Sequence, residues 1–155
     1  MSFNPHFYTM DIKTLRHSTA HIMAYAIGRL WPDAKFDIGP ATDDGFYYDF
    51  DLSHHLSAED FPAIEKEMAE IIKADYPLER IEMSRTEAEA FLKERGQGFK
   101  LERLADIPEG EAISFYRCGD YYDLCRGPHL PSTGCVKAFK IMSVAGSYYR
   151  GDEKN

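Results

Sequence analysis

Two pairs of polar side chains, about a hundred residues apart, constrain the fold of this chain most strongly. The first pair is His17 and His21 in the segment LRHSTAHIMA, and the second is Cys125 and His129 in DLCRGPHLP. Residues i and i+4 lie one above the other on the same face of a helix, so the first pair can direct two imidazoles at one place. The second pair lies in a loop with Gly and Pro, which can turn both side chains inward. We therefore predict a fold in which the four residues line one cleft.

Three histidines and one cysteine that converge make either a zinc site or a hydrolytic pocket. The four side chains are an acceptable set for tetrahedral zinc, but a site with all four positions filled leaves no position for water unless one ligand withdraws. Burial of a polar group without a partner costs roughly a few kcal/mol. A purely structural pocket would rarely accept four such groups, so the sequence favours a functional cluster.

The composition predicts one folded domain in a reducing compartment. The chain has 155 residues, of which 44% are hydrophobic and 14% aromatic, which is enough for a real core. Three cysteines, one of them in a motif, are typical of reduced thiols in a cytoplasmic protein. Neither a signal peptide nor a membrane span is expected. A net charge of −8 argues against a general nucleic-acid binder, although not against a protein that touches only one end of an RNA.

Helix and strand patterns alternate along the chain. Apolar residues at helical spacing predict a helix over 12–31, and the turn-forming ATDDG predicts a hairpin over 35–52. Capping boxes at Ser57 and Ser84 predict two further helices, with the short strand LERIEMS between them. The later elements are expected to be a short helix, two strands around a turn, and a last strand pair or long strand, in FKLERLADI, AISFYRCG, YYDLC and VKAFKIMSVAGSYYRG.

Strands that pair through hairpins, with helices between the groups, indicate an α+β domain. We expect a largely antiparallel sheet with helices packed on one face. The domain is expected to span residues 11–150. Residues 1–10 are predicted to be an N-terminal linker or tail, and residues 151–155 the start of another linker.

Four segments together resemble the editing domain of bacterial-type threonyl-tRNA synthetase, from about Leu15 to the last residue. They are LRHSTAHIMA, IGPATDDGFYYDFD, YYDLCRGPHLPSTG and VKAFKIMSVAGSYYRGDEKN. Alanyl-tRNA synthetase editing domains share the HxxxH and CxxxH skeleton, but DLCRGPH points to the threonyl branch. No signature for ATP binding or amino-acid activation is present. We therefore expect either the excised editing domain of a class II threonine–tRNA ligase, with a linker to a missing aminoacylation core, or a free-standing trans-editing relative.

The resemblance implies hydrolysis of mischarged seryl-tRNA(Thr), with the serine-carrying 3′ end of tRNA(Thr) and the aminoacylation core as partners. It suggests Lys100 as a group that stabilises charge or activates water, and Tyr48 as a pocket or terminal-adenosine contact. From the motifs, His17 is expected to orient or deprotonate water, and His21 to hold the water or the ribose. Contacts with the seryl group are expected from the second motif, from Cys125 and His129.

Asp123, two residues before Cys125, is placed either to hold the substrate ammonium or to orient a histidine. Cys125 has a second candidate role, as a nucleophile, although water attack on an activated ester does not require one. The predicted catalytic set is therefore His17, His21, Lys100, Asp123, Cys125 and His129, and the predicted substrate-binding set is Tyr48, Asp123 and Cys125.

The metal is an open question at this point. The alanyl branch uses a metal, whereas the threonyl branch is generally read as working without one. We expect no required cofactor, with zinc at His17, His21, Cys125 and His129 as the alternative. A non-catalytic, zinc-stapled tRNA-binding module is the remaining hypothesis. It requires stoichiometric zinc and loss of the fold on chelation.

Overall fold

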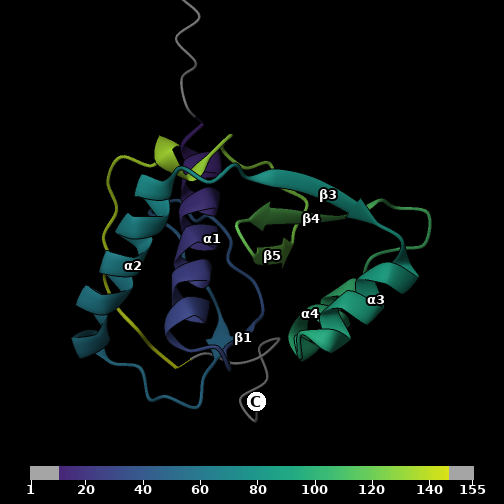
Figure 1. Ribbon diagram of the computed structural model, residues 1–155, viewed down its shortest axis with the longest axis horizontal. Coiled ribbons are helices and arrows are strands. Elements are labelled where there is room, and N and C mark those ends of the chain that lie inside the picture. Colours follow the sequence, from purple (N-terminus) through teal and green to yellow (C-terminus); the bar gives the residue numbers. More distant parts are fainter. Residues whose placement is uncertain (1–10, 147–155) are drawn as a thin grey trace, which may run out of the picture.

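The computed structural model describes residues 11–146 (Figure 1). The predicted tail at 1–10 and the predicted linker at 151–155 lie outside this range. None of the described helices has both the length and the apolar character needed to cross a membrane. The elements in chain order are α1 (Ile12–Leu30), β1 (Lys35–Phe36), β2 (Phe50–Asp51), the 3-10 helix η1 (Ala58–Asp60), α2 (Phe61–Ala74), β3 (Glu79–Met83), α3 (Arg85–Glu94), α4 (Gly98–Ala105), β4 (Ile113–Cys118), β5 (Tyr121–Leu124) and the 3-10 helix η2 (Thr133–Cys135).

The helix α1 is the central element of the larger hydrophobic core. Its N-cap is Asp11, whose carboxylate accepts from the Lys13 amide, and the helix ends one residue short of the Trp31–Pro32 step, since a residue before proline disfavours helical geometry. The second helix, α2, lies beside it (Figure 1). It turns Ile64, Met68 and Ile71 inward at the i, i+4, i+7 spacing of an amphipathic helix.

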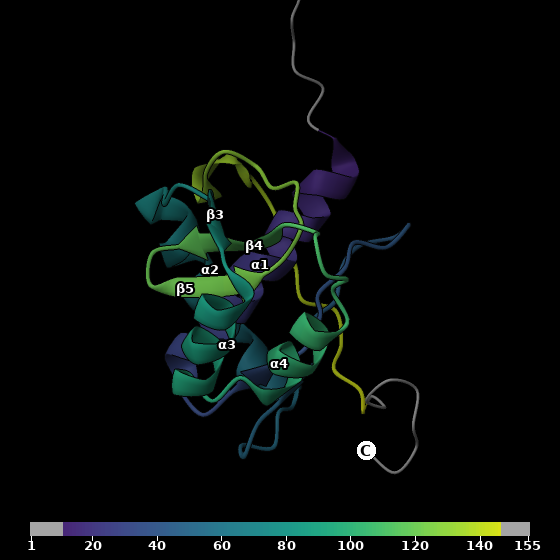
Figure 2. The same cartoon turned by 90° about the vertical axis from the view of Figure 1, so that its right-hand side faces the viewer.

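A three-stranded antiparallel sheet, in the order β3-β4-β5, forms the other half of the fold. Because successive side chains alternate across a strand, Ile113 and Phe115 of β4 pack in the smaller core with α3 and α4. Cys118 belongs instead to the core around α1. Figure 2 shows α3 and α4 together beyond one side of the strands. Residues of the face opposite these helices therefore turn toward α1.

The expected α+β class with antiparallel pairing is confirmed. The predicted hairpin forms through β1 and β2, in the register Lys35↔Asp51 and Phe36↔Phe50. Ser57 caps η1, the short 3-10 helix directly before α2, and the Asp60 carboxylate accepts from the Ser57 amide. Ser84 caps α3 with its hydroxyl, which accepts from the Glu87 amide.

The last predicted strand or strand pair is wrong as far as the structure describes it. Residues 137–146 belong to no strand and make no recorded backbone–backbone hydrogen bond within the described range. Two of their apolar side chains, Phe139 and Ile141, instead pack against the larger core, whereas Met142 and Val144 are exposed. An extended chain that crosses a helical layer has the same period-2 pattern as a strand, which explains the error. The part of this segment from residue 147 onward lies outside the described residues.

Candidate active site

The two motifs meet in space as their spacing predicts. His17 and His21 lie on α1, and Cys125 and His129 follow β5. The Cys125 Sγ atom is 3.3 Å from His17 Nε2 and 3.5 Å from His129 Nε2. The rings of His17 and His129 stack with their centroids 4.3 Å apart, and the His21 ring meets His129 edge-on at 5.0 Å. The three half-buried residues His17, Cys125 and His129 are called here the thiol–imidazole trio.

The loop that carries the second motif requires glycine at one position. Gly127 has φ +74°, and a Cβ atom there would lie 2.3 Å from the Tyr116 hydroxyl. The following Gly127–Pro128 peptide bond is cis. Glycine is therefore required both by the backbone angle and by the close approach of β4.

All three members of the trio are electrically neutral near pH 7. Burial, together with the negative charge of Asp123, raises the pKa of Cys125 to about 12, so the thiol keeps its proton. Burial and the two nearby imidazoles lower the pKa of His129 to about 2. Burial also lowers the pKa of His17, although the Pro128 carbonyl opposes part of this shift.

A second group of side chains lies behind the trio and is fully buried. Lys100 Nζ forms an ion pair with Oδ1 of Asp123 on β5, at 2.7 Å. The Tyr48 hydroxyl donates a hydrogen bond to Asp123 Oδ2 at 2.9 Å. His21 Nδ1 is 3.4 Å from the same Oδ2. The exposed fractions of His21, Asp123, Lys100 and Tyr48 are 1%, 4%, 6% and 7%. These four residues are called here the ionic cluster.

The charge of Lys100 controls the protonation state of this cluster. Burial alone would raise the pKa of Asp123, but the Lys100 ammonium and the neighbouring His21 outweigh it and hold that pKa well below its usual range. Burial and the Asp123 carboxylate raise the pKa of Tyr48 well above its usual value, so its phenol stays protonated and can donate. The cluster therefore contains an ionised carboxylate.

Lys100 reaches the site because side-chain hydrogen bonds hold α4 against the β1–β2 hairpin. The Gln97 side chain accepts a hydrogen bond from the Phe36 amide at 3.0 Å. One helical turn beyond Lys100, the Arg103 guanidinium donates two bonds to the buried Asp37 carboxylate, at 2.7 and 2.8 Å. A bidentate guanidinium–carboxylate pair fixes orientation as well as distance.

The sequence of this chain is similar to one family model and to several threonine–tRNA ligases. Residues 113–155 match the family described as the threonyl and alanyl tRNA synthetase second additional domain. Threonine–tRNA ligases of Syntrophomonas wolfei and Acetivibrio thermocellus are each 59% identical over 140 residues, which is 90% of this chain and 22% of each relative. The ligase of Clostridium tetani is 55% identical over 143 residues, which is 92% of this chain and 22% of the relative. Residues 113–155 of the chain belong to the threonyl and alanyl tRNA synthetase second additional domain family. The resemblance carried by its motifs is thereby confirmed, and the chain spans about a fifth of the length of the curated relatives it matches.

The structure brings together all seven residues that the sequence singled out, as the trio and the ionic cluster. The contacts of each residue indicate which role it can have. Asp123 already has three partners within the ionic cluster and is almost completely buried. This favours the orienting role that the sequence left open for it over a contact with a substrate ammonium. The Tyr48 hydroxyl is likewise engaged with Asp123. The trio is more accessible and is the better candidate to meet a substrate.

The trio fits zinc, whereas the predicted set of four does not form. The ligand atoms of His17, Cys125 and His129 lie within 4.8 Å of one another, with Sγ–N distances of 3.3 and 3.5 Å. Zinc bonds of about 2.0–2.3 Å in tetrahedral geometry place ligand atoms about 3.5 Å apart. His21 is not part of this group, because it is turned to Asp123. A zinc held by three ligands would keep one position open and supply a Lewis acid.

Four residues that help to build the site were not singled out from the sequence. They are Ser18, which bonds His129, and the three that hold α4, namely Asp37, Gln97 and Arg103. Ser18 could have been suspected from its place inside the HxxxH motif. The other three carry no local signal, since their partners lie more than 60 residues away in the chain.

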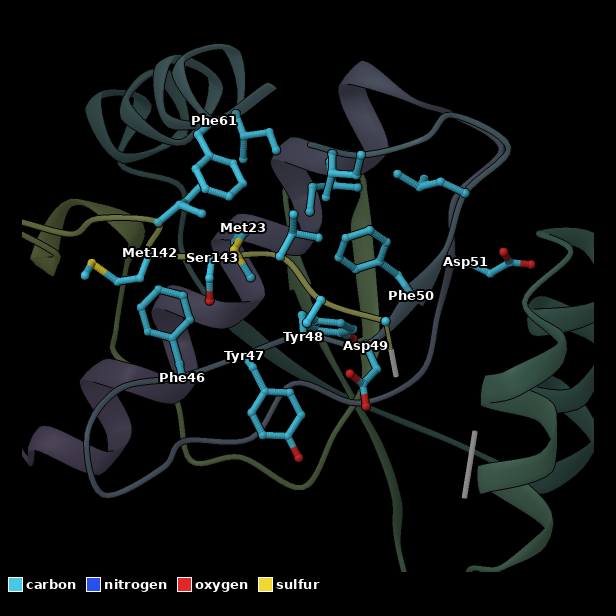
Figure 3. Close-up of a pocket in the computed structure, with 18 of the residues that line it drawn as sticks. Met23, Phe46, Tyr47, Tyr48, Asp49, Phe50, Asp51, Phe61, Met142 and Ser143 are labelled. Atoms are coloured by element: carbon cyan, nitrogen blue, oxygen red, sulfur yellow. The ribbon is translucent and has the colours of Figure 1, made fainter. Parts of the chain in front are cut away.

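A cavity of about 1030 Å³ has a lining that includes no member of the trio. It opens between the hairpin, α1, the start of α2 and residues 140–146, and Figure 3 shows Met23, Phe46, Phe50 and Phe61 around it. Of the ionic cluster, only Tyr48 lines it, so most of the convergent polar groups lie outside this cavity.

Proposed function

We propose that this chain hydrolyses the ester of serine on the 3′ end of tRNA(Thr), as the editing module of a threonine–tRNA ligase. The observation that carries the proposal is the neutral, half-buried trio, supported from behind by the ionic cluster. A pocket selected for threonine cannot strongly reject serine, because one methyl group is worth roughly 1–3 kcal/mol, or about 10- to 200-fold. Higher fidelity requires a second site that destroys the wrong ester.

The chemistry follows from the protons of the trio. His17 Nδ1 faces the Pro128 carbonyl at 3.4 Å, which can only accept, so Nδ1 carries the proton. Nε2 is then the unprotonated nitrogen, which acts as a base when a water replaces the Cys125 thiol as its hydrogen-bond donor. Nε2 takes a proton from water as the water oxygen bonds to the ester carbonyl carbon. The tetrahedral intermediate then expels the ribose oxygen, which receives a proton, and serine and deacylated tRNA result. Cys125 remains a thiol, which supports water over cysteine as the nucleophile.

The ionic cluster has a positioning part in this proposal. Asp123 Oδ2 lies 3.4 Å from His21 Nδ1, and the His21 ring packs edge-on against His129. Lys100 balances the carboxylate, so that His21 is oriented at a buried position without an uncompensated charge. The ionic cluster thereby fixes the position of His21, the residue against which His129 of the trio packs.

Deacylation of Ser-tRNA(Thr) and Thr-tRNA(Thr) by the chain tests the proposal. We expect the seryl ester to be hydrolysed faster than the threonyl ester. The assay needs a high protein concentration, because a chain with a net charge of −8 neutralises few tRNA phosphates and binds tRNA weakly. Equal rates on the two esters would reject editing. His55→Ala is a matched control for His17→Ala, since His55 is exposed and does not belong to the trio.

The zinc-stapled, non-catalytic module is the second candidate, and the trio's fit to zinc is the observation in its favour. It requires one zinc per chain and unfolding by a chelator. A folded, metal-free chain that hydrolyses seryl-tRNA would reject the non-catalytic module and support the editing function. Whether editing occurs in cis or in trans depends on the reading frame beyond Asn155.

A further inference from the structure

Ser18 is a fully buried residue of α1 whose hydroxyl leaves its own helix. Its exposed fraction is 0%. The Oγ atom accepts a hydrogen bond from the Leu130 amide at 2.9 Å and lies 3.0 Å from His129 Nδ1. The next hydroxyl along the helix, that of Thr19, follows the common pattern and donates to the Leu15 carbonyl one turn back, at 2.7 Å. Ser18 therefore makes a specific connection between α1 and the second motif.

The proton of the Ser18 hydroxyl has one acceptor. A serine hydroxyl has one proton and two lone pairs, and the Leu130 N–H occupies one lone pair. Within the described residues the other recorded partner is His129 Nδ1, so the hydroxyl donates there. The reverse polarity would leave a buried O–H without an acceptor, at a cost of about 1–3 kcal/mol. His129 Nδ1 is therefore the unprotonated nitrogen, and the ring proton is on Nε2.

The contacts of the Cys125 sulfur lead independently to the same tautomer. His17 Nε2 is an acceptor, because its Nδ1–H faces the Pro128 carbonyl. The single thiol proton goes to that nitrogen, across 3.3 Å. The Gly127 amide donates to the sulfur at 3.2 Å. The remaining contact, from Sγ to His129 Nε2 at 3.5 Å, then needs a proton that only His129 can supply.

We propose that Ser18 is a positioning residue that holds His129 in the Nε2–H tautomer, so that a donor N–H on His129 and the acceptor nitrogen of His17 both point to the Cys125 sulfur. On the proposed function, this arrangement places a base and a hydrogen-bond donor on the two sides of one ester. The donor meets the carbonyl oxygen as negative charge develops on it. Two histidines with the same tautomer would supply only two bases or only two donors.

The tautomer can be measured directly in the wild-type chain, without substrate. In long-range ¹H–¹⁵N correlation spectra of ¹⁵N-labelled protein, we expect His129 to show a protonated Nε2 and an unprotonated Nδ1. His17 should show the reverse pattern. An Nδ1–H tautomer at His129 overturns the proposal, whatever the chain does to aminoacyl-tRNA.

Removal of the Ser18 hydroxyl tests the consequence. In Ser18→Ala we expect the His129 signals to move toward the other tautomer. The kcat for seryl-tRNA(Thr) should fall about 10- to 100-fold with little change in KM, because one donor is misplaced only in the transition state. Thr19→Ala is the matched control, since it removes a neighbouring buried hydroxyl that does not contact the trio.

The two proposals can fail separately. If Ser18→Ala keeps both the Nε2–H signal and the wild-type kcat, Ser18 does not position His129. If the wild-type tautomers are as expected but neither aminoacyl-tRNA is hydrolysed, the inference about Ser18 stands and the proposed editing function is rejected.

Discussion

The two halves of the candidate site differ in charge and in access. The ionic cluster contains an ionised carboxylate and a lysine, and its exposed side-chain fractions at Asp123 and Lys100 are 6% and 7%. The thiol–imidazole trio is neutral, and each of its members is half-buried. The charged groups of the site are therefore buried, whereas its more accessible groups are neutral.

This difference indicates how stability and catalysis are distributed. Removal of one partner from a buried ion pair leaves an uncompensated charge in the interior, which is costly to the fold. Neutral, half-buried groups can be replaced at lower cost. We expect substitutions in the ionic cluster to act on folding first, and substitutions in the trio to act on the reaction alone.

The largest expected effect is that of Asp123→Asn. The substitution leaves the Lys100 ammonium buried without its counter-charge, so we expect a loss of about 3–5 kcal/mol in the free energy of unfolding, together with loss of hydrolysis. Urea denaturation measures the first quantity. Glu111→Gln breaks the exposed pair with Arg126 and should cost no more than about 1 kcal/mol. If both variants lost a similar free energy of unfolding, the ionic cluster would not have the special role in stability that we assign to it.

A second substitution and an acid titration sharpen this prediction. Asp123→Asn combined with Lys100→Met removes both charges, and much of the stability should return. In the wild type the pKa of Asp123 is depressed, so its contribution is complete above the unfolded value of about 4 and is lost as the pH falls below it. The free energy of unfolding of Asp123→Asn should therefore fall less steeply with acid than that of the wild type.

In the trio, His17→Ala should slow seryl-tRNA(Thr) hydrolysis about 10²- to 10⁴-fold, because removal of a general base has that range of effects. Its unfolding curve should stay close to that of the wild type, since His17 is half-buried and neutral. Single-turnover rates and urea midpoints, with His55→Ala as control, give both quantities. An unchanged rate in the folded variant would remove His17 from the mechanism.

A smaller effect is expected where α4 is fastened to the hairpin. Arg103→Lys keeps the charge near Asp37 but loses the two parallel bonds, so we expect about 1–2 kcal/mol of destabilisation. Hydrolysis should fall by about tenfold, because Lys100 lies one turn away on the same helix. Circular dichroism melts and deacylation rates measure the two effects. A fully active Arg103→Lys would mean that the placement of Lys100 does not depend on this pair.

The local parts of the site could be predicted from the sequence. The spacing of His17 and His21 determined a shared helix face, and the two capping serines marked helix starts correctly. These features depend on residues within one or two turns of each other. The inclusion of Lys100 and Tyr48 came from the resemblance alone, since a lysine near a helix start is usually solvated, whereas Lys100 is buried.

What could not be predicted depends on contacts between distant segments. Nothing near Asp37 or Arg103 indicates their pairing across 66 positions. The polarity of the Ser18 hydroxyl depends on a loop 111 residues later. The strand expected after Val136 is absent from the described residues, because apolar side chains such as Phe139 and Ile141 pack against a core without pairing to another strand.

The smallest expected effect is that of metal removal. Zinc would bind at the Nε2 atoms of His17 and His129 and at the Cys125 thiolate, so it would have to displace the thiol proton and the Nε2 proton inferred for His129. It would also occupy the nitrogen that serves as the base on His17. We therefore expect dialysis against a chelator to change seryl-tRNA(Thr) hydrolysis less than about twofold and added zinc to inhibit it, in rate assays paired with measured metal content. Loss of activity on chelation, with recovery at one zinc per chain, would show that the half-buried side of the site works as a metal centre and not as a set of neutral proton donors and acceptors.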